Sequence, residues 1–183
     1  VVSTLDRSEQ PAVVWAPASA ADRPTPVLVF LHSWRSDYRQ ANTDWQREAV
    51  ERGWIYLHPN FRGVNERQEA CGSELARQDI LDAIDDVSTR YRVDSARVYL
   101  AGTSGGGHMA MLMAGYQPRR FSAVSAWVGI SDLAAWQRFH TREGQPTKYA
   151  QMLEACVGGP PGTSAVVDAQ YRSRSPLTVL GRV

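Results

Sequence analysis

One serine in the chain lies in a setting suited to nucleophilic chemistry. Ser104 is the middle residue of Gly102-Thr103-Ser104-Gly105-Gly106, which matches the pattern G-x-S-x-G. A short apolar run, residues 97–101, precedes this pattern, and a helix-like run, residues 105–116, follows it. A serine between a buried strand and a helix is held in a sharp, strained turn that exposes its hydroxyl. These residues therefore predict a nucleophile for acyl transfer at Ser104.

This glycine-rich stretch has two other interpretations, an incidental turn and a phosphate-binding loop. The pattern alone is short and recurs by chance, as an incidental serine in a turn, but its place between a strand and a helix favours the nucleophile. A phosphate-binding loop would carry the lysine of G-x-x-x-x-G-K-[ST] or the spacing G-x-G-x-x-G. Neither pattern is present in this stretch.

Acyl transfer also needs hydrogen-bond donors aimed at the oxyanion that develops in the reaction. In the strand–serine–helix arrangement, one donor is the backbone N–H of the residue after the nucleophile, here Gly105, and the other comes from the loop after an earlier central strand. Residues 26–32 are expected to be that strand, and its loop begins with Ser33 and Trp34. The backbone amide of Trp34 or of Ser33 is therefore the second candidate donor. The alternative is an ordinary connection with a structural tryptophan.

Four histidines could in principle serve as the general base. His140 lies in an irregular segment above the expected site and is retained as a candidate. Structural roles are favoured for the other three, namely His32 and His58, which end predicted strands, and His108, which lies in the first turns of a helix.

Asp132 is the candidate acid, because it follows the strand after the predicted nucleophile. It also precedes a helix-like run, and Asp is a favoured N-cap residue, so capping is the preferred interpretation. The acidic residues of the 73–91 helix are expected mostly on a solvated face; they are Asp79, Asp82, Asp85 and Asp86. No group of His, Cys, Asp and Glu has metal-site spacing, and neither a metal nor a cofactor is predicted.

The elements that position these residues alternate between strand and helix. Strands are expected at residues 12–16, 26–32, 54–58, 97–101 and 121–128. Helices are expected at 41–52, 73–91 and 105–116, with shorter ones at 133–140, 149–156 and 165–171. Parallel neighbours need crossover connections, so this order predicts an α/β fold, a three-layer α/β/α sandwich with a mostly parallel, doubly wound sheet. We expect one domain over residues 1–183, with 133–162 as a possible lid or cap-like insertion.

Composition limits the classes of partner. The chain has 183 residues, of which 43% are hydrophobic and 21% charged, and a formal net charge of +1. This balance gives no reason to expect nucleic acid or an anionic membrane as a partner. No targeting segment and no apolar run long enough to span a bilayer is found, and the localisation and oligomeric state are left open. Cys71 and Cys156 could form one bridge or remain two unpaired thiols.

The chain resembles the prolyl oligopeptidase-like branch of the α/β hydrolases. The resemblance lies in His58-Pro59-Asn60-Phe61-Arg62-Gly63, in Gln78-Asp79-Ile80-Leu81-Asp82-Ala83, and in the stretch around Ser104. It covers nearly the whole chain and implies the α/β-hydrolase fold. It also implies a serine peptidase or esterase that cleaves a small ester or peptide substrate through an acyl-enzyme on Ser104.

This sequence departs from the family pattern at two places. Many relatives have glycine after the histidine of the oxyanion loop, where this chain has Ser33. In the family, the acid and the histidine follow the last two strands, and residues 171–180 resemble the part just before them, so we expect those C-terminal strands to be missing. A truncated or catalytically inactive binding protein is the alternative function. A base supplied by His140 or by another chain is a third hypothesis.

Overall fold

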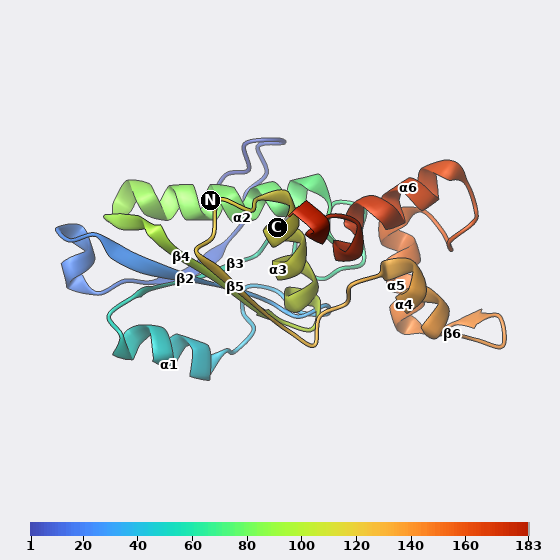
Figure 1. Cartoon of the computed structure of the whole chain (residues 1–183), viewed down its shortest axis with the longest axis horizontal. Helices are drawn as coiled ribbons and strands as arrows, with labels where there is room; N and C mark the ends of the chain where they lie inside the picture. The colour runs from blue at the N-terminus through green and yellow to red at the C-terminus, as the bar shows by residue number, and fades with distance from the viewer. Residues whose placement is uncertain (183) are drawn as a thin grey trace.

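A five-stranded sheet forms the centre of the fold, in a computed structural model that describes residues 1–182 (Figure 1). The strands are β1 (Ala12–Trp15), β2 (Thr25–Leu31), β3 (Ile55–Pro59), β4 (Val93–Thr103) and β5 (Ala123–Trp127), in the order β1-β3-β2-β4-β5. β1 runs antiparallel to β3, and the other neighbours are parallel. The mostly parallel sheet expected from the sequence is confirmed.

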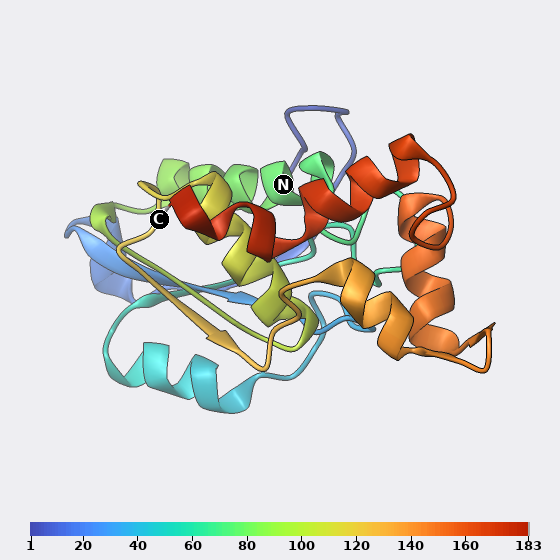
Figure 2. The ribbon, with the colours of Figure 1, turned by 45° about the vertical axis from the view of Figure 1, so that its right-hand side comes forward.

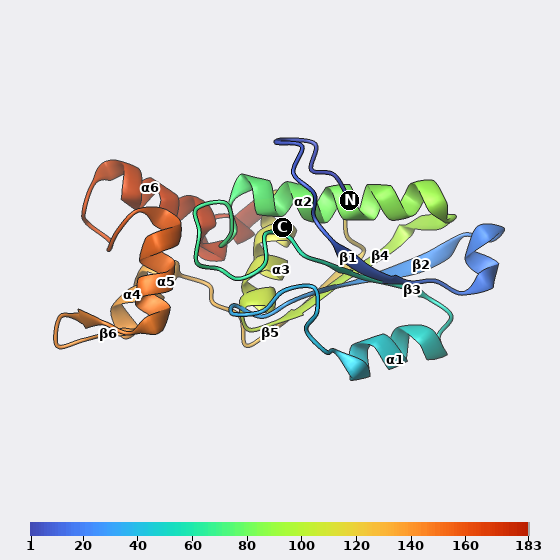
Figure 3. The same cartoon turned by 180° about the vertical axis from the view of Figure 1, so that it is seen from behind.

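Helices cover both faces of this sheet. Helix α1 (Thr43–Glu51) lies on one face, and α2 (Glu74–Arg90) and α3 (Gly105–Tyr116) lie on the other, as Figure 1 and the view from behind in Figure 3 show. The predicted three-layer sandwich is therefore present. Within residues 1–182, no helix combines the length and apolar character needed to cross a membrane.

Three further helices gather beyond the carboxyl end of β5, as Figure 2 shows. They are α4 (Leu133–Phe139), α5 (Lys148–Val157) and α6 (Ala165–Arg174). A hairpin of two short strands, β6 (Thr141–Arg142) and β7 (Gln145–Pro146), joins α4 to α5. Within residues 1–182, the chain also has three short 3-10 helices, one between β1 and β2 and two after α6, at Ala18–Ala21, Pro176–Thr178 and Leu180–Arg182. We refer to residues 133–174 as the helical segment.

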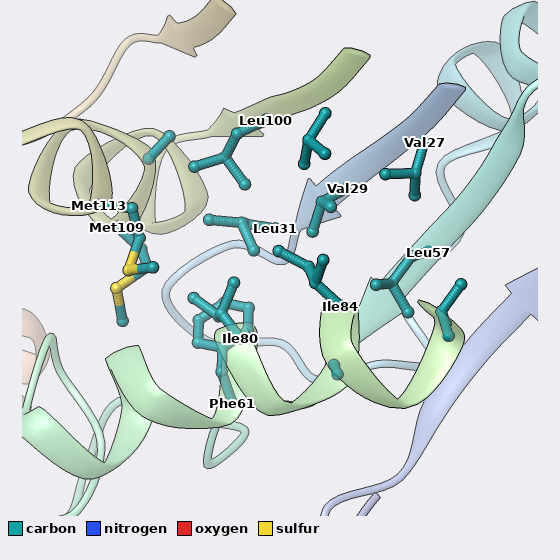
Figure 4. Close-up of a cluster of buried hydrophobic side chains, with 14 of the residues drawn as sticks. Val27, Val29, Leu31, Leu57, Phe61, Ile80, Ile84, Leu100, Met109 and Met113 are labelled. Carbon is teal, nitrogen blue, oxygen red and sulfur yellow. The ribbon is translucent and has the colours of Figure 1, made fainter. Parts of the chain in front are cut away.

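The central strand β2 organises the core because every one of its residues is buried. Successive side chains of a strand point to opposite faces of the sheet. Val27, Val29 and Leu31 accordingly pack toward α2 and α3, in the cluster drawn in Figure 4. Leu28 and Phe30 pack in a separate cluster with Ala49 of α1. This two-sided burial explains why the sequence of β2 is a continuous apolar run rather than an alternating one.

The helical segment has a hydrophobic cluster of its own. Side chains from α4, α5 and α6 pack there against Trp34 and Cys71, which come from loops of the sheet domain. The cluster also contains Cys156, whose thiol lies near enough to Cys71 to add to the effect of burial in raising the pKa of the Cys71 thiol. The fold thus brings the two cysteines together, and they are unbridged in this structure. Burial raises the pKa of the Cys71 thiol, which is therefore protonated at neutral pH.

The expectation of a solvated acidic face on α2 is wrong for two of its four residues. Asp79 and Asp82 are only 1% and 6% exposed. Asp82 accepts hydrogen bonds from the backbone N–H and the hydroxyl of Thr4, at 2.7 and 2.9 Å. Asp79 accepts from the Arg62 guanidinium. The physical reason is that distant parts of the chain pack over α2 and satisfy these carboxylates, which helix periodicity cannot reveal.

Candidate active site

Ser104 occupies the tight turn between β4 and α3. Its backbone has φ 58° and ψ −116°, in the region that residues other than glycine rarely adopt. Its N–H donates to the Trp127 carbonyl of β5 at 2.9 Å, and its own carbonyl accepts from the His108 N–H at 2.9 Å. The residue is partly exposed. The strained strand-to-helix turn expected from the sequence is therefore present.

The glycines around Ser104 let backbone segments approach closely. A Cβ atom on Gly102 would lie 2.3 Å from the Gly106 carbonyl oxygen, and one on Gly106 would lie 2.1 Å from the Leu31 carbonyl oxygen. A Cβ atom on Gly105 would lie 2.3 Å from the Trp34 backbone nitrogen. Helix α3 therefore begins directly against the end of β2 and the loop that follows it. Larger residues at these positions would separate the two segments.

Gly106→Ala is expected to lower the free energy of unfolding by about 3 kcal/mol, the upper end of typical overpacking costs. The atoms that the new methyl group would meet belong to the backbone of Leu31 and His32, which cannot move aside as a side chain can. Urea unfolding monitored by circular dichroism measures the loss. Gly181→Ala is the matched control, since a Cβ atom there meets nothing within 4 Å. Equal stability of the two variants would contradict the expected close packing.

The loop after β2 brings one backbone amide without an acceptor beside Ser104. The Ser33 N–H donates to Oε1 of Gln40 at 2.7 Å. In the described part of the chain, neither the Trp34 N–H nor the Gly105 N–H has a hydrogen-bond acceptor. Of the two candidates for the second donor, the amide of Trp34 is therefore the one that is free. The sequence does not predict this contact, because Gln40 lies seven residues after Ser33 in a polar loop with no recognisable motif.

Three of the four histidines are buried and engaged away from Ser104. His32 stacks on Phe61 at 3.8 Å between ring centroids, and its Nε2 lies 2.5 Å from the Asn60 carbonyl oxygen. The His108 Nε2–H donates to the Arg174 carbonyl at 2.7 Å. Loss of solvation on burial lowers the pKa of His32, and lowers those of His58 and His108 to about 4. All three rings are therefore neutral at neutral pH.

We expect the protein to lose stability as the pH falls below about 6.5, the usual pKa of histidine. In the folded state the pKa values of His58 and His108 are about 4. Between pH 6.5 and 4 the unfolded chain binds protons that the folded chain does not, so acid favours unfolding. Each ring contributes about 2 kcal/mol of loss between pH 7 and pH 5. Urea unfolding at both pH values measures it, and an unchanged pH difference in His108→Gln would contradict this origin.

The candidate acid and base are not hydrogen-bonded to Ser104. Asp132 is the N-cap residue of α4, where its Oδ1 accepts the Ala135 N–H at 2.9 Å, so the preferred capping interpretation is confirmed. His140 is partly exposed, and its ring lies 4.9 Å from Trp136 and 5.1 Å from Tyr149. Within residues 1–182, no side-chain hydrogen bond joins a histidine to a serine hydroxyl or to a carboxylate.

The cap of α4 gives a direct test of what Asp132 does. Asp132→Ala is expected to lower the free energy of unfolding by about 1 kcal/mol, because the Ala135 amide loses its acceptor. Asp132→Ser should retain most of that stability, since serine is also a good N-cap residue. If Asp132 is in addition the acid of the site, Asp132→Ser would lower the rate of hydrolysis while leaving stability almost unchanged. Thermal unfolding and ester hydrolysis, measured side by side, separate the two roles.

An aromatic cluster joins the loop after β2 to the helical segment. The Trp34 ring is buried and lies 4.7 Å from Trp136, which is 5.4 Å from Tyr149. Trp34 also lies 5.8 Å from His108. The side chain of Trp34 is thus anchored in the interior while its backbone amide borders Ser104. Within residues 1–182, no group of His, Cys, Asp and Glu is arranged to hold a metal ion.

A strained serine between a parallel strand and a helix, in a sheet covered by helices on both faces, defines the chain as an α/β-hydrolase-fold protein. It belongs to the prolyl oligopeptidase family, which matches residues 41–155, well over half of the chain. Both the fold and the family implied by the sequence motifs are thereby confirmed.

The curated relatives match only part of this chain, and this chain matches only part of each of them. The chain is 32% identical over 96 residues to a bifunctional acetylxylan esterase/xylanase from Neocallimastix patriciarum, covering 51% of this chain and 14% of that protein. It is 30% identical over 134 residues to feruloyl esterase B from Neurospora crassa, covering 64% and 43%. Among solved structures, a post-proline cleaving enzyme from Rickettsia typhi has a TM-score of 0.74 at 16% identity, over 98% of this chain and 26% of that one. The chain thus spans less than half of each curated relative named here.

Proposed function

We propose that the chain carries an acyl-hydrolase site in which Ser104 is the nucleophile. The observation that supports this most strongly is the strained turn at Ser104, with the unpaired amides of Gly105 and Trp34 beside it. A backbone conformation that costs free energy persists where the surroundings enforce it, and such positions cluster at active sites. Membership of the prolyl oligopeptidase family supports the same chemistry.

In the proposed reaction, the Ser104 Oγ attacks the substrate carbonyl carbon while a general base accepts the hydroxyl proton. The carbonyl π electrons move to oxygen, and the N–H groups of Gly105 and Trp34 donate to the resulting oxyanion. The start of α3 adds the positive end of a helix dipole. Collapse of this intermediate expels the leaving group, which takes the proton back from the base, and gives an acyl-enzyme. Water then attacks the acyl carbon, and the acid product leaves as the Ser104 hydroxyl is restored.

The identity of the base stays open in this proposal. His32, His58 and His108 are buried, and the His32 and His108 rings are hydrogen-bonded to backbone carbonyls. Among residues 1–182, His140 is the histidine whose ring is partly exposed, and Asp132 is the acid considered with it. Both are retained as candidates, and Asp132→Ser tests the acid.

We propose a carboxylic ester rather than a peptide as the substrate class. The curated relatives that share 30 to 32% identity with this chain are named as esterases. An ester also places a smaller demand on the catalytic acid, because an alkoxide or phenoxide leaves with less help from a proton than an amine does. The family also includes peptide-cleaving proteins, so a peptide substrate is the competing choice within the same mechanism.

The test is to mix the protein with p-nitrophenyl acetate and, separately, with a peptide p-nitroanilide, and to follow p-nitrophenol or p-nitroaniline release. An acyl-enzyme predicts an initial burst of p-nitrophenol that scales with protein concentration, followed by slower turnover. We expect faster release from the ester than from the anilide. A faster anilide reaction would replace the ester assignment. No burst and no turnover with either substrate would favour the catalytically inactive binding protein.

A further inference from the structure

The loop between β2 and α1 contains a hydrogen bond that bears on the geometry beside Ser104. The Ser33 backbone N–H donates to the Gln40 side chain at 2.7 Å, and the Ser33 hydroxyl lies 3.5 Å from the Thr103 carbonyl oxygen. The next peptide unit carries the Trp34 N–H, which has no acceptor in the described chain. The Gln40 side chain thus accepts the Ser33 N–H, while the Trp34 N–H remains available to a substrate oxygen.

Both the oxygen and the nitrogen of the Gln40 side-chain amide are hydrogen-bonded. Its Nε2 donates to Oδ1 of Asn42 at 2.9 Å, while its Oε1 accepts from Ser33. The Asn42 Nδ2 in turn donates to the Gln40 carbonyl at 3.1 Å. The Gln40 N–H closes a turn onto the Asp37 carbonyl at 3.0 Å. These bonds fix the conformation of Gln40, so that its Oε1 is a rigid rather than a mobile acceptor.

Asn42 makes these contacts at the expense of a more usual role. It is the N-cap residue of α1, a position at which asparagine is favoured because its side chain accepts a helix N–H. Here the Asn42 side chain makes no capping hydrogen bond. It turns instead toward Gln40 and toward the buried ring of His58, whose Nδ1 lies 3.5 Å away. The loop therefore gives up a local stabilisation while keeping Gln40 in place.

The second amide of the loop has little freedom to move. The Trp34 backbone nitrogen lies so close to Gly105 that a Cβ atom there would be 2.3 Å from it. The Trp34 ring is buried against Trp136. With Gln40 holding the preceding peptide, the Trp34 amide is fixed from both sides.

We propose that Gln40 is a positioning residue for the oxyanion hole, which holds the Ser33–Trp34 backbone so that the Trp34 N–H stays beside Ser104 and Gly105. This inference rests on the proposed function, because it explains how the second oxyanion donor is kept in place. Gln40 does not touch the substrate in this account. It acts through the Ser33 peptide.

The test measures the second-order rate constant for phosphonylation of Ser104 by an aryl fluorophosphonate, together with kcat and KM for p-nitrophenyl acetate. Gln40→Met keeps the length of the side chain and removes the oxygen acceptor. It is expected to lower kcat and the phosphonylation rate about 10- to 100-fold, because the oxyanion donor is displaced. KM should change by less than about threefold, since an interaction made mainly in the transition state is lost.

Gln40→Glu retains an oxygen acceptor for the Ser33 N–H and is expected to recover most of the rate. Arg39→Met is the matched control, because the Arg39 side chain lies in the same loop and is 74% exposed. Wild-type rates in Gln40→Met, or equal losses in Gln40→Met and Arg39→Met, would overturn the role of Gln40. Wild-type protein that is not phosphonylated at Ser104 would instead overturn the proposed function, so the two failures are distinguishable.

Discussion

Ser104→Ala is expected to lower the rate of ester hydrolysis by about 10⁴-fold or more, because removal of the nucleophile ends the acyl-enzyme route. The fold should be unaffected. The Ser104 hydroxyl has no hydrogen-bond partner in the described chain, and the bonds of this turn to Trp127 and His108 are made by backbone atoms. Any rate that remains would come from the oxyanion donors and substrate binding alone.

Initial rates with p-nitrophenyl acetate and thermal unfolding together check this prediction. Ser173→Ala is the matched control, because Ser173 is exposed on α6 and its hydroxyl bonds only to the Gln170 carbonyl, one turn back in the same helix. A Ser104→Ala variant that keeps the wild-type rate would remove Ser104 from the mechanism. If Ser104→Ala lost both activity and thermal stability, the hydroxyl would contribute to the fold, which would contradict this prediction.

Asp79→Ala is expected to lower the free energy of unfolding by about 3 kcal/mol, the lower end of the cost of breaking a buried ion pair, because the Arg62 guanidinium loses its buried partner and keeps only Asp6 as a charged partner. The Asp79 carboxylate is fully buried and accepts from Nε and Nη2 of Arg62, at 2.5 and 3.0 Å. Arg62 also binds Asp6 at 2.7 Å and the Ser3 hydroxyl at 3.1 Å. This network ties the N-terminal segment to α2, and its hydrogen bonds lower the pKa of Asp6 and raise that of Arg62.

Denaturant unfolding of three variants separates the cost of an unpaired charge from the cost of losing a side chain on α2. Asp79→Leu combined with Arg62→Met removes both charges and should be less destabilising than Asp79→Ala. Asp86→Ala breaks an exposed pair with Arg90 on the same helix and is expected to cost about 0.5 kcal/mol or less. A loss below about 1 kcal/mol in Asp79→Ala would contradict the assignment of a buried ion pair.

Local sequence signals located the framework and the strained turn at Ser104. The apolar run of β2 reflects its burial on both faces, and the glycines around Ser104 reflect contacts between segments close to the turn itself. Ser73 was also expected at the start of α2, and its side chain accepts the Ala76 N–H at 3.1 Å. Such features depend on residues only a few positions apart, or on the pattern within one element, so a sequence contains them directly.

Features that depend on distant contacts were not predictable. Asp82 is buried by Thr4, which lies 78 positions away, and the thiols of Cys71 and Cys156 meet only because α5 packs on a loop of the sheet domain. The first half of β4 has exposed polar residues, so only its apolar end was expected as a strand. The choice between the Ser33 and Trp34 amides depends on the side chain of Gln40, a polar residue in a loop without periodicity.

We propose that the Ser104 hydroxyl is an activated nucleophile beside two oxyanion donors. The most direct measurement is intact-mass and peptide mass spectrometry after treatment with an aryl fluorophosphonate. The account predicts the addition of one phosphonyl group per chain, located on the peptide that contains Ser104, and no addition to Ser104→Ala. Equal modification of the Ser104→Ala variant, or modification of the wild-type protein at another residue, would contradict it.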